Sequence, residues 1–533
     1  MLAVILIGAA NGQPGGVHPT DIFPAFQLPA YDDGADSALF TAFSRLQVGG
    51  RAKALGLSGA SATAAWRTAQ SLLDQRIATP AHPRPGRLVA FQGSSASALN
   101  RLIATSDAAN IQITSGLLNI DQPIEIRRRD LTLDLASARL ISANSQPYLL
   151  RVENTTNVSI QGGLFVSGDS AILVSSSSSV DISDVAIDSL TGAGIVITGS
   201  TRVSIVDSRI SGLPLAGILV HRGTTLSIVQ RNRITGGTGA SNMTAGIVVS
   251  DREVDVSSNP RTIFGLNGYW PITQPMMQRQ NPPRDNLIAW NSISNGLSSG
   301  IYVDGGVRNV FFANQLRGNS KEGLCLDNGS SANVVASNTV YDNGQRWGDS
   351  DMVLSLDEVL DGGRLPDGTA AEKVPGISID NAAYNVVFAN DVAHNFGGGV
   401  KFVRTAYYNA VGLNTILDDN DGAGDIFHFF GIELGAAPGS SSDLDFTPSR
   451  GNIIFSNVIR GSHYSGIFFG PGSDTNNVRY NSILDAIAWA LESVTQMSNT
   501  SVNNLTTLPS RNIGSGLDPA LITSGQAIND APM

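Results

Sequence analysis

The phrase Gly300-Ile301-Tyr302-Val303, repeated 23 residues later as Gly323-Leu324-Cys325-Leu326, decides the fold. Each copy is a glycine followed by apolar residues at alternate positions, which is the period of a β-strand. The phrase recurs along the chain at Gly194, Gly217, Gly246, Gly376, Gly399, Gly431 and Gly466. A fixed repeat of this length, with no helical pattern inside it, is typical of a β-solenoid in which each repeat forms one coil.

Two series of asparagines share this period. The first series begins a strand and the second lies five residues later. The members are Asn309, Asn333, Asn385, Asn409, Asn452 and Asn476 in the first series, and Asn314, Asn338, Asn390, Asn414, Asn457 and Asn481 in the second. Asparagine tolerates left-handed backbone at a tight corner, and amides stacked on successive coils can hydrogen-bond along the stack. We therefore predict two asparagine columns at corners of the coil.

The composition supports one elongated domain. A solenoid grows along one axis, so a length of 533 residues does not require several globular units. Charged residues make up 15% of the chain, against about a quarter in typical domains, and the 57 glycines suit many short strands and corners. The net charge of −11, without any basic patch interleaved with aromatics, argues against a nucleic-acid partner.

The N-terminus carries a weak export signal. Leu2 to Ala10 is apolar and resembles the core of a secretory signal peptide, although no basic residue precedes it. This run is too short to span a membrane. We interpret residues 1–34 as a signal remnant and an extended arm, which predicts a secreted or periplasmic protein; a buried N-terminal strand is the alternative. The single cysteine, Cys325, excludes a disulfide within one chain.

Three further regions follow from the pattern. Helical spacing in residues 35–46 and 60–76 predicts a helical N-terminal cap within residues 35–110, because the open first coil of a solenoid has to be covered. Residues 111–500 are predicted to form the coils. Residues 501–533 are predicted to be an irregular C-terminal tail.

Long insertions interrupt the coils at residues 251–283, 344–375, 421–430 and 436–448. Each lies close to a strand that begins with glycine. Because loops of a solenoid map to one face, often the binding face, we expect these insertions to wall a groove. The floor of the groove is then the outward side of the glycine-started strands.

Three aspartates are predicted to lie in one row on that floor. Strand alternation points Asp304, Asp327 and Asp380 outward at equivalent positions, provided that residues 344–375 form a loop and not an extra coil. Stacked carboxylates at a spacing of about 4.8 Å raise the pKa of at least one of them. An acid beside an ionised carboxylate is what catalysis on a glycosidic bond requires. The alternative is structural, since Asp-Gly and Asp-Asn are ordinary corner dipeptides.

The expected roles follow from the order of the row. Asp327, flanked on both sides, is predicted to be the general acid, and either neighbour the base or nucleophile. The separation between adjacent coils corresponds to retaining enzymes, and the separation across two coils to inverting ones. Glu433 is the next candidate acid.

Five neighbouring residues are candidates for substrate binding. Lys401 lies one coil beyond the last aspartate, where it can pair with that carboxylate or bind substrate oxygens, and Arg404 lies nearby. Tyr302, with Tyr269 and Trp270 from the first long insertion, can stack on a sugar ring. Loop packing and a surface salt bridge are the structural alternatives.

The second insertion is acidic. Its carboxylates are Asp349, Asp351, Asp357, Glu358, Asp361 and Asp367. Such oxygen ligands can hold calcium, but they do not keep the spacing of a helix-loop-helix calcium site, and acidic surface loops are usually only solvated. We therefore assign no cofactor and keep calcium as an alternative.

The coil pattern of residues 110–500 resembles the right-handed parallel β-helix, or pectin-lyase-like, superfamily. Its members include pectate lyases, polygalacturonases, fructotransferases and phage tailspikes. The resemblance implies an all-β, right-handed, single-stranded parallel β-helix, here with a small N-terminal helical cap. Polygalacturonases carry Asn-Thr-Asp, Asp-Asp, Gly-His-Gly and Arg-Ile-Lys motifs. Here Asp380 is followed by Asn381, Gly-His-Gly does not occur, and only Val400-Lys401 resembles the last motif, so no specific enzyme family is matched.

The sequence thus predicts a carbohydrate-active enzyme that cleaves or transfers glycosidic linkages of a polysaccharide or oligosaccharide. The carboxylate row disfavours a polyuronate substrate unless calcium offsets the charge. The alternatives are a calcium-assisted polysaccharide lyase and a non-catalytic glycan-binding solenoid similar to a tailspike adhesin. The resemblance implies carbohydrate by analogy only, and it makes a homotrimer an expectation, because trimers are known in the superfamily.

Overall fold

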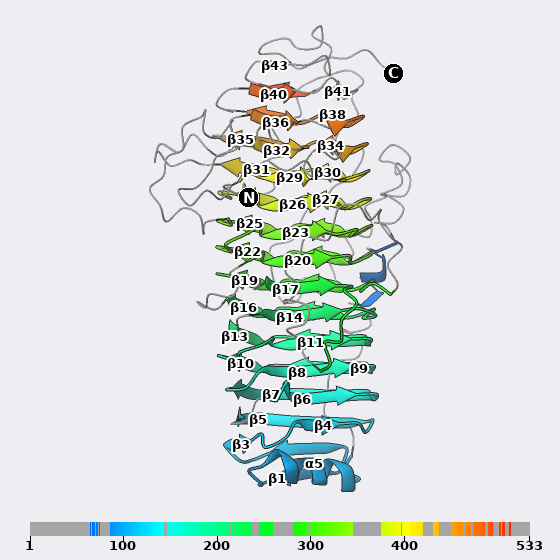
Figure 1. Cartoon of the computed structure of the whole chain (residues 1–533), viewed down its shortest axis with the longest axis vertical. Helices are drawn as coiled ribbons and strands as arrows, with labels where there is room; N and C mark the ends of the chain where they lie inside the picture. The colour runs from blue at the N-terminus through cyan, green and yellow to red at the C-terminus, as the bar shows by residue number, and fades with distance from the viewer. Residues whose placement is uncertain are drawn as a thin grey trace.

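The computed structural model describes parts of residues 64–74 and most of residues 86–512. Within 86–512 it does not describe residues 143–145, 214, 237–244, 259–280, 297, 345–374, 396, 404, 419–429, 436–448, 462–464, 471–472, 485–488, 494–499, 503 and 507–510. The strands stack in parallel along one long axis (Figure 1). The fold is the predicted right-handed parallel β-helix.

One face of the β-helix is a 14-stranded parallel sheet, named here sheet B. Its strands are β4 (Ile124–Ile126), β6 (Tyr148–Glu153), β8 (Ser170–Ser175), β11 (Ile195–Thr198), β14 (Ala216–His221), β17 (Ala245–Ser250), β20 (Ile301–Asp304), β23 (Leu324–Asp327), β26 (Ile377–Asp380), β29 (Val400–Val403), β32 (Phe430–Leu434), β36 (Ser465–Phe469), β40 (Trp489–Ser493) and β43 (Arg511–Asn512). The glycine-started phrases of the sequence form the middle of this sheet.

The rest of each coil belongs to a 27-stranded sheet, named here sheet A, which forms two rows joined by long strands near the N-terminal end. Its first strands are β1 (Leu88–Phe91), β2 (Asn110–Ile113), β3 (Leu117–Asn119), β5 (Leu131–Ile141), β7 (Thr156–Val166), β9 (Ser178–Ser183), β10 (Ala186–Asp188), β12 (Thr201–Val206) and β13 (Arg209–Leu213). One row continues through β15 (Ile228–Gln230), β18 (Leu287–Ala289), β21 (Val310–Phe312), β24 (Val334–Ala336), β27 (Val386–Phe388), β30 (Ala410–Gly412), β34 (Ile453–Phe455), β38 (Asn477–Arg479) and β41 (Thr500–Val502). The other row continues through β16 (Arg233–Gly236), β19 (Ser292–Ser294), β22 (Gln315–Arg317), β25 (Thr339–Tyr341), β28 (Asp391–Ala393), β31 (Thr415–Asp418), β35 (Val458–Gly461), β39 (Ser482–Leu484) and β42 (Leu505–Thr506). Two short strands, β33 (Ser449–Arg450) and β37 (Ser473–Asp474), pair at a corner.

The insertion at residues 344–375 does not add a coil to the ladder. Strand β23 pairs directly with β26, with Leu324 opposite Ile377, and β25 pairs directly with β28. The predicted register of the aspartate row therefore holds across this insertion.

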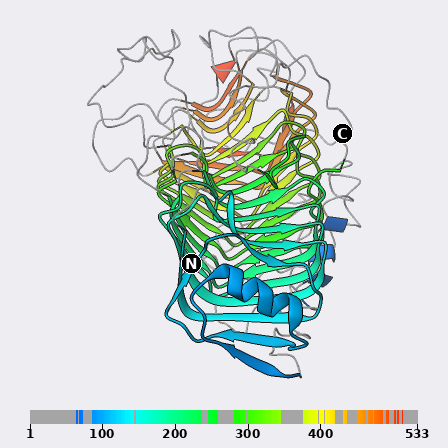
Figure 2. The ribbon, with the colours of Figure 1, turned by 60° about the horizontal axis from the view of Figure 1, so that its bottom comes forward.

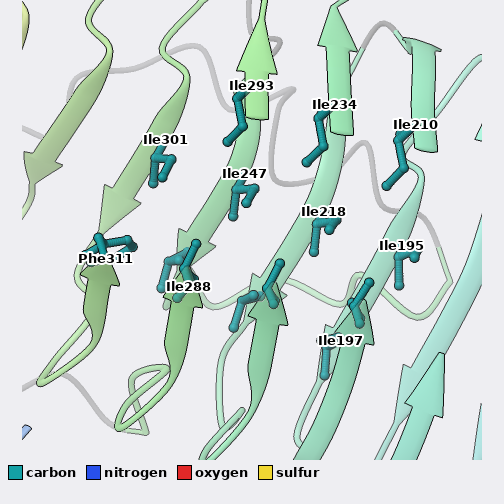
Figure 3. Packing of buried hydrophobic residues seen from close by; sticks show 14 of the residues in the cluster. Ile195, Ile197, Ile210, Ile218, Ile234, Ile247, Ile288, Ile293, Ile301 and Phe311 are labelled. Carbon is teal, nitrogen blue, oxygen red and sulfur yellow. The ribbon is translucent and has the colours of Figure 1, made fainter. Parts of the chain in front are cut away.

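The interior is filled by aliphatic stacks that run along the axis. Figure 3 shows one set, in which Ile195, Ile218, Ile247 and Ile301 on successive strands of sheet B lie in line. The alternate apolar residues of the glycine-started strands form two inward stacks, and all of their members are at most 1% exposed. They are Ile301, Leu324, Ile377, Val400 and Ile432, and Val303, Leu326, Ile379, Phe402 and Leu434.

The repeated glycines are needed for space. A Cβ atom at Gly246 would lie 2.2 Å from Cγ2 of Ile293, and one at Gly399 would lie 2.4 Å from Cγ2 of Ile416. Both distances are far below van der Waals contact. Glycine therefore begins each of these strands because the chain passes directly against the core isoleucines of sheet A.

The two predicted asparagine columns are hydrogen-bonded ladders. In Asn338, Oδ1 accepts from the backbone N and from Nδ2 of Asn314 on the preceding coil, at 2.9 and 3.0 Å. Its Nδ2 donates to Oδ1 of Asn390 on the next coil and to the carbonyl oxygen of Phe311, both at 3.0 Å. The buried amide thus uses all four of its hydrogen-bonding positions. A third, unpredicted column consists of Asn319, Asn343 and Asn395.

The left-handed corner residue is not the asparagine itself. Positive φ values occur at the residue directly before each ladder asparagine, such as 51° at Ala313 before Asn314 and 55° at Ser337 before Asn338. The expectation that asparagine supplies the left-handed backbone of these corners was therefore wrong. The asparagine follows the turn, and its amide lies inside the coil, where the ladder satisfies it.

A helix covers the N-terminal end, as expected, but it is not one of the segments with the predicted helical spacing. Helix α5 (Ala96–Thr105) lies across the first coil (Figure 2), with Leu99 and Ile103 buried in the core. Ser95 caps it, because its Oγ accepts from the backbone N of Ala98. The ladder also begins before residue 111, since β1 already pairs with β2.

The helical residues within 64–74 pack elsewhere. Ala65, Ala69 and Leu72 belong to a cluster on the outer side of sheet A, together with Leu287 and Val310. Figure 1 shows this segment, in dark blue, beside the middle of the stack. The segment packs there because the outward side chains of the sheet A row that contains Leu287 and Val310 are apolar, and the contact removes them from water. Residues 35–46 lie outside the described residues.

The C-terminal coils extend past residue 500. Strand β41 pairs with β38, and β43 pairs with β40. Strands therefore occur within residues 501–512, where an irregular tail was predicted, and residues 513–533 are not described. In the part of the chain that is described, no helix is long and apolar enough to cross a membrane.

Candidate functional site

The outward side of sheet B changes character along the axis. On four successive strands the outward column is apolar and buried, at Leu173, Val196, Leu219 and Val248. From β20 onward the same column carries polar or ionisable side chains, which are Tyr302, Cys325, Ser378, Lys401 and Glu433. The candidate site is therefore confined to the strands β20, β23, β26, β29 and β32.

The three aspartates occupy the predicted positions. Asp304 pairs with Asp327 in the register of β20 and β23, and Asp380 ends β26, the next strand of the sheet. The residues directly before them are buried in the interior cluster. The carboxylates therefore leave the sheet on its outward side, on consecutive coils.

Asp304 is held in a buried ion pair. Its Oδ2 lies 2.6 Å from Nε of Arg252 and accepts from Oγ of Ser250 at 3.2 Å. Its Oδ1 accepts from Nδ2 of Asn328 at 2.9 Å. The Arg252 and Asp304 side chains are only 5% and 1% exposed. Burial lowers the pKa of the guanidinium, but the Asp304 charge raises it above the usual value.

This ion pair corrects one premise of the sequence analysis. The prediction assumed that an uncompensated Asp304 repels its neighbour Asp327. Because Arg252 neutralises Asp304, most of that repulsion is offset. Arg252 belongs to a long insertion outside the repeat, so the repeat pattern could not place it here.

Asp327 is fixed by two donors. The Tyr302 hydroxyl donates to its Oδ2 at 2.9 Å, and the backbone N of Asn328 donates to its Oδ1 at 2.6 Å. Burial, and then the negative charges of Asp327 and Asp304, raise the pKa of Tyr302 well above its ordinary value. Tyr302 therefore stays protonated and acts as a hydrogen-bond donor, whereas the sequence suggested a stacking platform.

Asp380 is half-buried and lies at a corner. The following residue, Asn381, has left-handed backbone with φ of 45°, as has Asn328 after Asp327, with φ of 51°. The side chain of Asn381 is itself held, because its Oδ1 accepts from Oγ1 of Thr405. The corner role proposed as the structural alternative is thus real, and it fixes the direction of the neighbouring carboxylates.

Lys401 forms an ion pair with Glu433. Its Nζ lies 3.5 Å from Oε2 of Glu433, so its partner is not the expected Asp380. Glu433 is 2% exposed, and within the described residues neither of its carboxylate oxygens has a hydrogen-bond partner. The only compensation described for this buried charge is the Lys401 ammonium.

A short segment, residues 251–258, crosses the apolar part of sheet B and is called the strap. Nε2 of His221 hydrogen-bonds to the carbonyl oxygen of Arg252 at 2.9 Å, and the Tyr148 hydroxyl donates to that of Val256. Val254 and Val256 belong to the apolar cluster of this face. Figure 1 shows the strap as a green trace that descends from β17 along β14 and β11. The strap was not predicted, although the alternation of Val254 and Val256 was a signal for it.

His221 is buried beneath the start of the strap. Its Nδ1 hydrogen-bonds to Oγ1 of Thr198 at 2.9 Å. Desolvation lowers the pKa of His221 to about 4, in spite of the hydrogen bond to the Arg252 carbonyl. The ring is therefore neutral at neutral pH, with Nε2 as the donor to that carbonyl.

Several predicted residues lie outside the described part of the chain. They are Tyr269, Trp270, Arg404 and the acidic residues of the second insertion. Among the residues that are described, no group of three or more His, Cys, Asp or Glu side chains is arranged to hold a metal ion. Calcium binding by the acidic insertion stays a prediction.

Comparison with known families decides the classification. The model of the right-handed β-helix region matches residues 141–267 and 276–416, just over half of the chain. The chain belongs to the right-handed β-helix family. No curated protein sequence matches this β-helix protein.

Solved structures that resemble this β-helix protein have diverse functions. A mannuronan C-5 epimerase module of Azotobacter vinelandii is 13% identical, with 78% of this chain and 96% of that chain covered and a TM-score of 0.45. A surface adhesin of Streptococcus pneumoniae is 13% identical, with 74% and 87% covered and a TM-score of 0.43. Tailspike protein 3 of bacteriophage CBA120 is 8% identical, with 85% and 63% covered and a TM-score of 0.45. At these identities the likeness does not extend to the chemistry of the site.

Proposed function

We propose that this β-helix protein is a carbohydrate-active enzyme that cleaves or transfers glycosidic bonds, with Asp327 and Asp380 as its carboxyl pair. One observation carries the proposal: these two carboxylates leave the same side of sheet B from the adjacent strands β23 and β26. Adjacent strands lie about 4.8 Å apart. The carboxyl groups of retaining glycosidases lie about 5–5.5 Å apart, so the pair suits a double displacement with retained configuration.

The hydrogen bonds around Asp327 indicate which of the two carboxyl groups is the nucleophile and which is the acid and base. Donors on both oxygens of Asp327 favour its ionised form, which suits a nucleophile. Asp380 is then the acid and base. This assignment reverses the order expected from the sequence, where Asp327 was the acid, because Arg252 removes the repulsion that was to keep Asp327 protonated.

The reaction has two steps. Asp327 forms a bond to the anomeric carbon as the glycosidic C–O bond breaks, and Asp380 gives its proton to the leaving oxygen. In the second step Asp380 takes a proton from water, or from an acceptor sugar hydroxyl. The oxygen of that molecule then displaces Asp327 from the anomeric carbon. Asp304 touches neither reacting atom in this scheme and serves as a positioning residue through Asn328.

The test uses xylan, laminarin, galactomannan, α-1,3-glucan and polygalacturonate, each with and without calcium. New reducing ends report hydrolysis, and ultraviolet-absorbing unsaturated products report a lyase. We expect Asp327→Asn and Asp380→Asn each to lower turnover by orders of magnitude with the fold intact. Asp107→Asn, at a carboxylate that is 83% exposed near the first coil, is the matched control and should retain full activity.

Azide separates the two roles. With Asp327→Ala, azide should replace the missing nucleophile and give a glycosyl azide of inverted configuration. With Asp380→Ala it should give one of retained configuration. Near-normal activity of both asparagine variants would refute the carboxyl pair. Unsaturated products would establish the lyase alternative, and binding without cleavage would establish a glycan-binding solenoid. The same preparation, measured by light scattering, checks the predicted trimer.

A further inference from the structure

The polar floor of the candidate site is closed on its N-terminal side by the strap. The strap residues lie over the strands that precede β20. There Val254 and Val256 pack with Leu173 and Leu219 of the outward column. Those two leucines are 0% exposed. A glycan on the polar strands therefore cannot continue along the sheet in this direction, because protein already occupies the surface.

The strap is anchored at several points. His221 and Asp304 hold Arg252 at its beginning, and the Tyr148 hydroxyl holds Val256 near its end. The anchors come from β14, β20 and β6, so they are spread over most of the length that the strap covers. This part of the molecule is a fixed wall.

On its C-terminal side the polar floor ends at two aromatic rings. Phe468 follows Glu433 in the outward column, one strand further along. Its ring stacks on the ring of Phe430, with centroids 4.3 Å apart and planes inclined by 11°. Phe468 is 2% exposed and Phe430 is 6% exposed. The column thus ends in a buried apolar stack directly after the Lys401–Glu433 ion pair.

The polar floor between the strap and the Phe430–Phe468 stack is short. Five strands, from β20 to β32, carry the polar column, and four spacings of about 4.8 Å give a floor about 19 Å long. We propose that this site binds the end of a glycan chain or a short oligosaccharide, and not the interior of a long polymer. The inference rests on the proposed function and specifies its substrate.

Two measurements test the inference on the polysaccharide that the five-member panel identifies by binding or cleavage. The first is the time course of product size. We expect short products from the outset, with little early loss of viscosity. Rapid loss of viscosity with a broad range of long products would show internal cleavage and would overturn the inference, while the enzymatic proposal would stand.

The second measurement needs no catalysis. Oligosaccharides of increasing length are prepared from the same polysaccharide, with a bulky fluorophore on neither end, on one end or on both ends. Affinity should stop rising with length at short oligomers, and a label on both ends should weaken binding at least tenfold. Undiminished binding of the doubly labelled oligomer would overturn the inference. Loss of binding on labelling, without any cleavage by the wild type, would support the closed site and refute the enzyme.

A pair of variants tests the C-terminal wall directly. Phe468→Ala removes the ring that ends the floor, and Phe388→Ala removes a buried ring of the cluster on sheet A, which serves as the matched control for stability. We expect Phe468→Ala to restore binding of the doubly labelled oligomer at least severalfold relative to the control. Equal rejection by a folded Phe468→Ala would show that the aromatic stack is not the wall.

Discussion

Replacing Asn338 by leucine tests whether the asparagine ladders hold the coils together. Leucine has nearly the same shape as asparagine but makes no hydrogen bond. The change leaves two buried groups without a partner, which are the backbone N of Asn314 and one N–H of the Asn314 amide, and it removes one hydrogen bond from the carbonyl oxygen of Phe311. Each unsatisfied buried group costs about 1–3 kcal/mol. The sum for the two groups, about 2–6 kcal/mol, is comparable with the whole stability of many domains.

The assay is unfolding in urea, followed by circular dichroism and by hydrogen exchange. Hydrogen exchange is needed because long repeat arrays can unfold in parts. We expect the coils around β21 and β24 to lose protection first and the transition midpoint to fall. Gln315→Leu is the control, because it makes a similar change at an exposed position on β22 and should cost less than about 0.5 kcal/mol. If both variants unfold like the wild type, the ladder is not a main source of stability.

Three further perturbations probe other contacts. Burial lowers the pKa of His221 to about 4 from the ordinary 6.5. The contribution of neutral His221 to the free energy of unfolding is therefore fully present above about pH 6.5. It is lost as the pH falls towards 4, by about 3 kcal/mol; His221→Gln should flatten this dependence in thermal melts, and an unchanged dependence would contradict the reasoning. Arg252→Met strands the buried Asp304 charge and should destabilise by about 3–5 kcal/mol, with most of the loss recovered when Asp304 is also changed to leucine; no recovery in the melting temperature would argue against the ion pair. Leu324→Asp places a charge in the core and should prevent folding, so a soluble variant with a normal melting temperature would show that the register is wrong.

The repeat could be read from the sequence because its physics is local. Each coil repeats the same contacts with the next, so glycines at points of close approach and asparagines in ladders recur with the period of the fold. That recurrence placed Asp304, Asp327 and Asp380 on consecutive strands on the condition that residues 344–375 add no coil, and the direct pairing of β23 with β26 met this condition. It could not assign the left-handed corner to the residue before each asparagine, since residues as different as Ala313 and Ser337 occupy that place.

The parts that escaped prediction are those outside the repeat. Arg252 and Val256 belong to an insertion, and their partners Asp304 and Tyr148 lie far away along the chain. No period links such pairs, so the strap and its ion pair became visible only in three dimensions. The same holds for Lys401, whose choice between two neighbouring carboxylates depends on side-chain directions.

The helical residues Ala65, Ala69 and Leu72 have a consequence for the order of folding. They are synthesised before every coil, yet the apolar cluster that they join is formed by strands from β15 onward. During synthesis this segment therefore has no surface to bind until the middle coils exist. Its docking should be a late event that reports a completed stack. A chain that stops early would leave both the segment and the apolar row exposed, and quality-control proteases and chaperones recognise such surfaces.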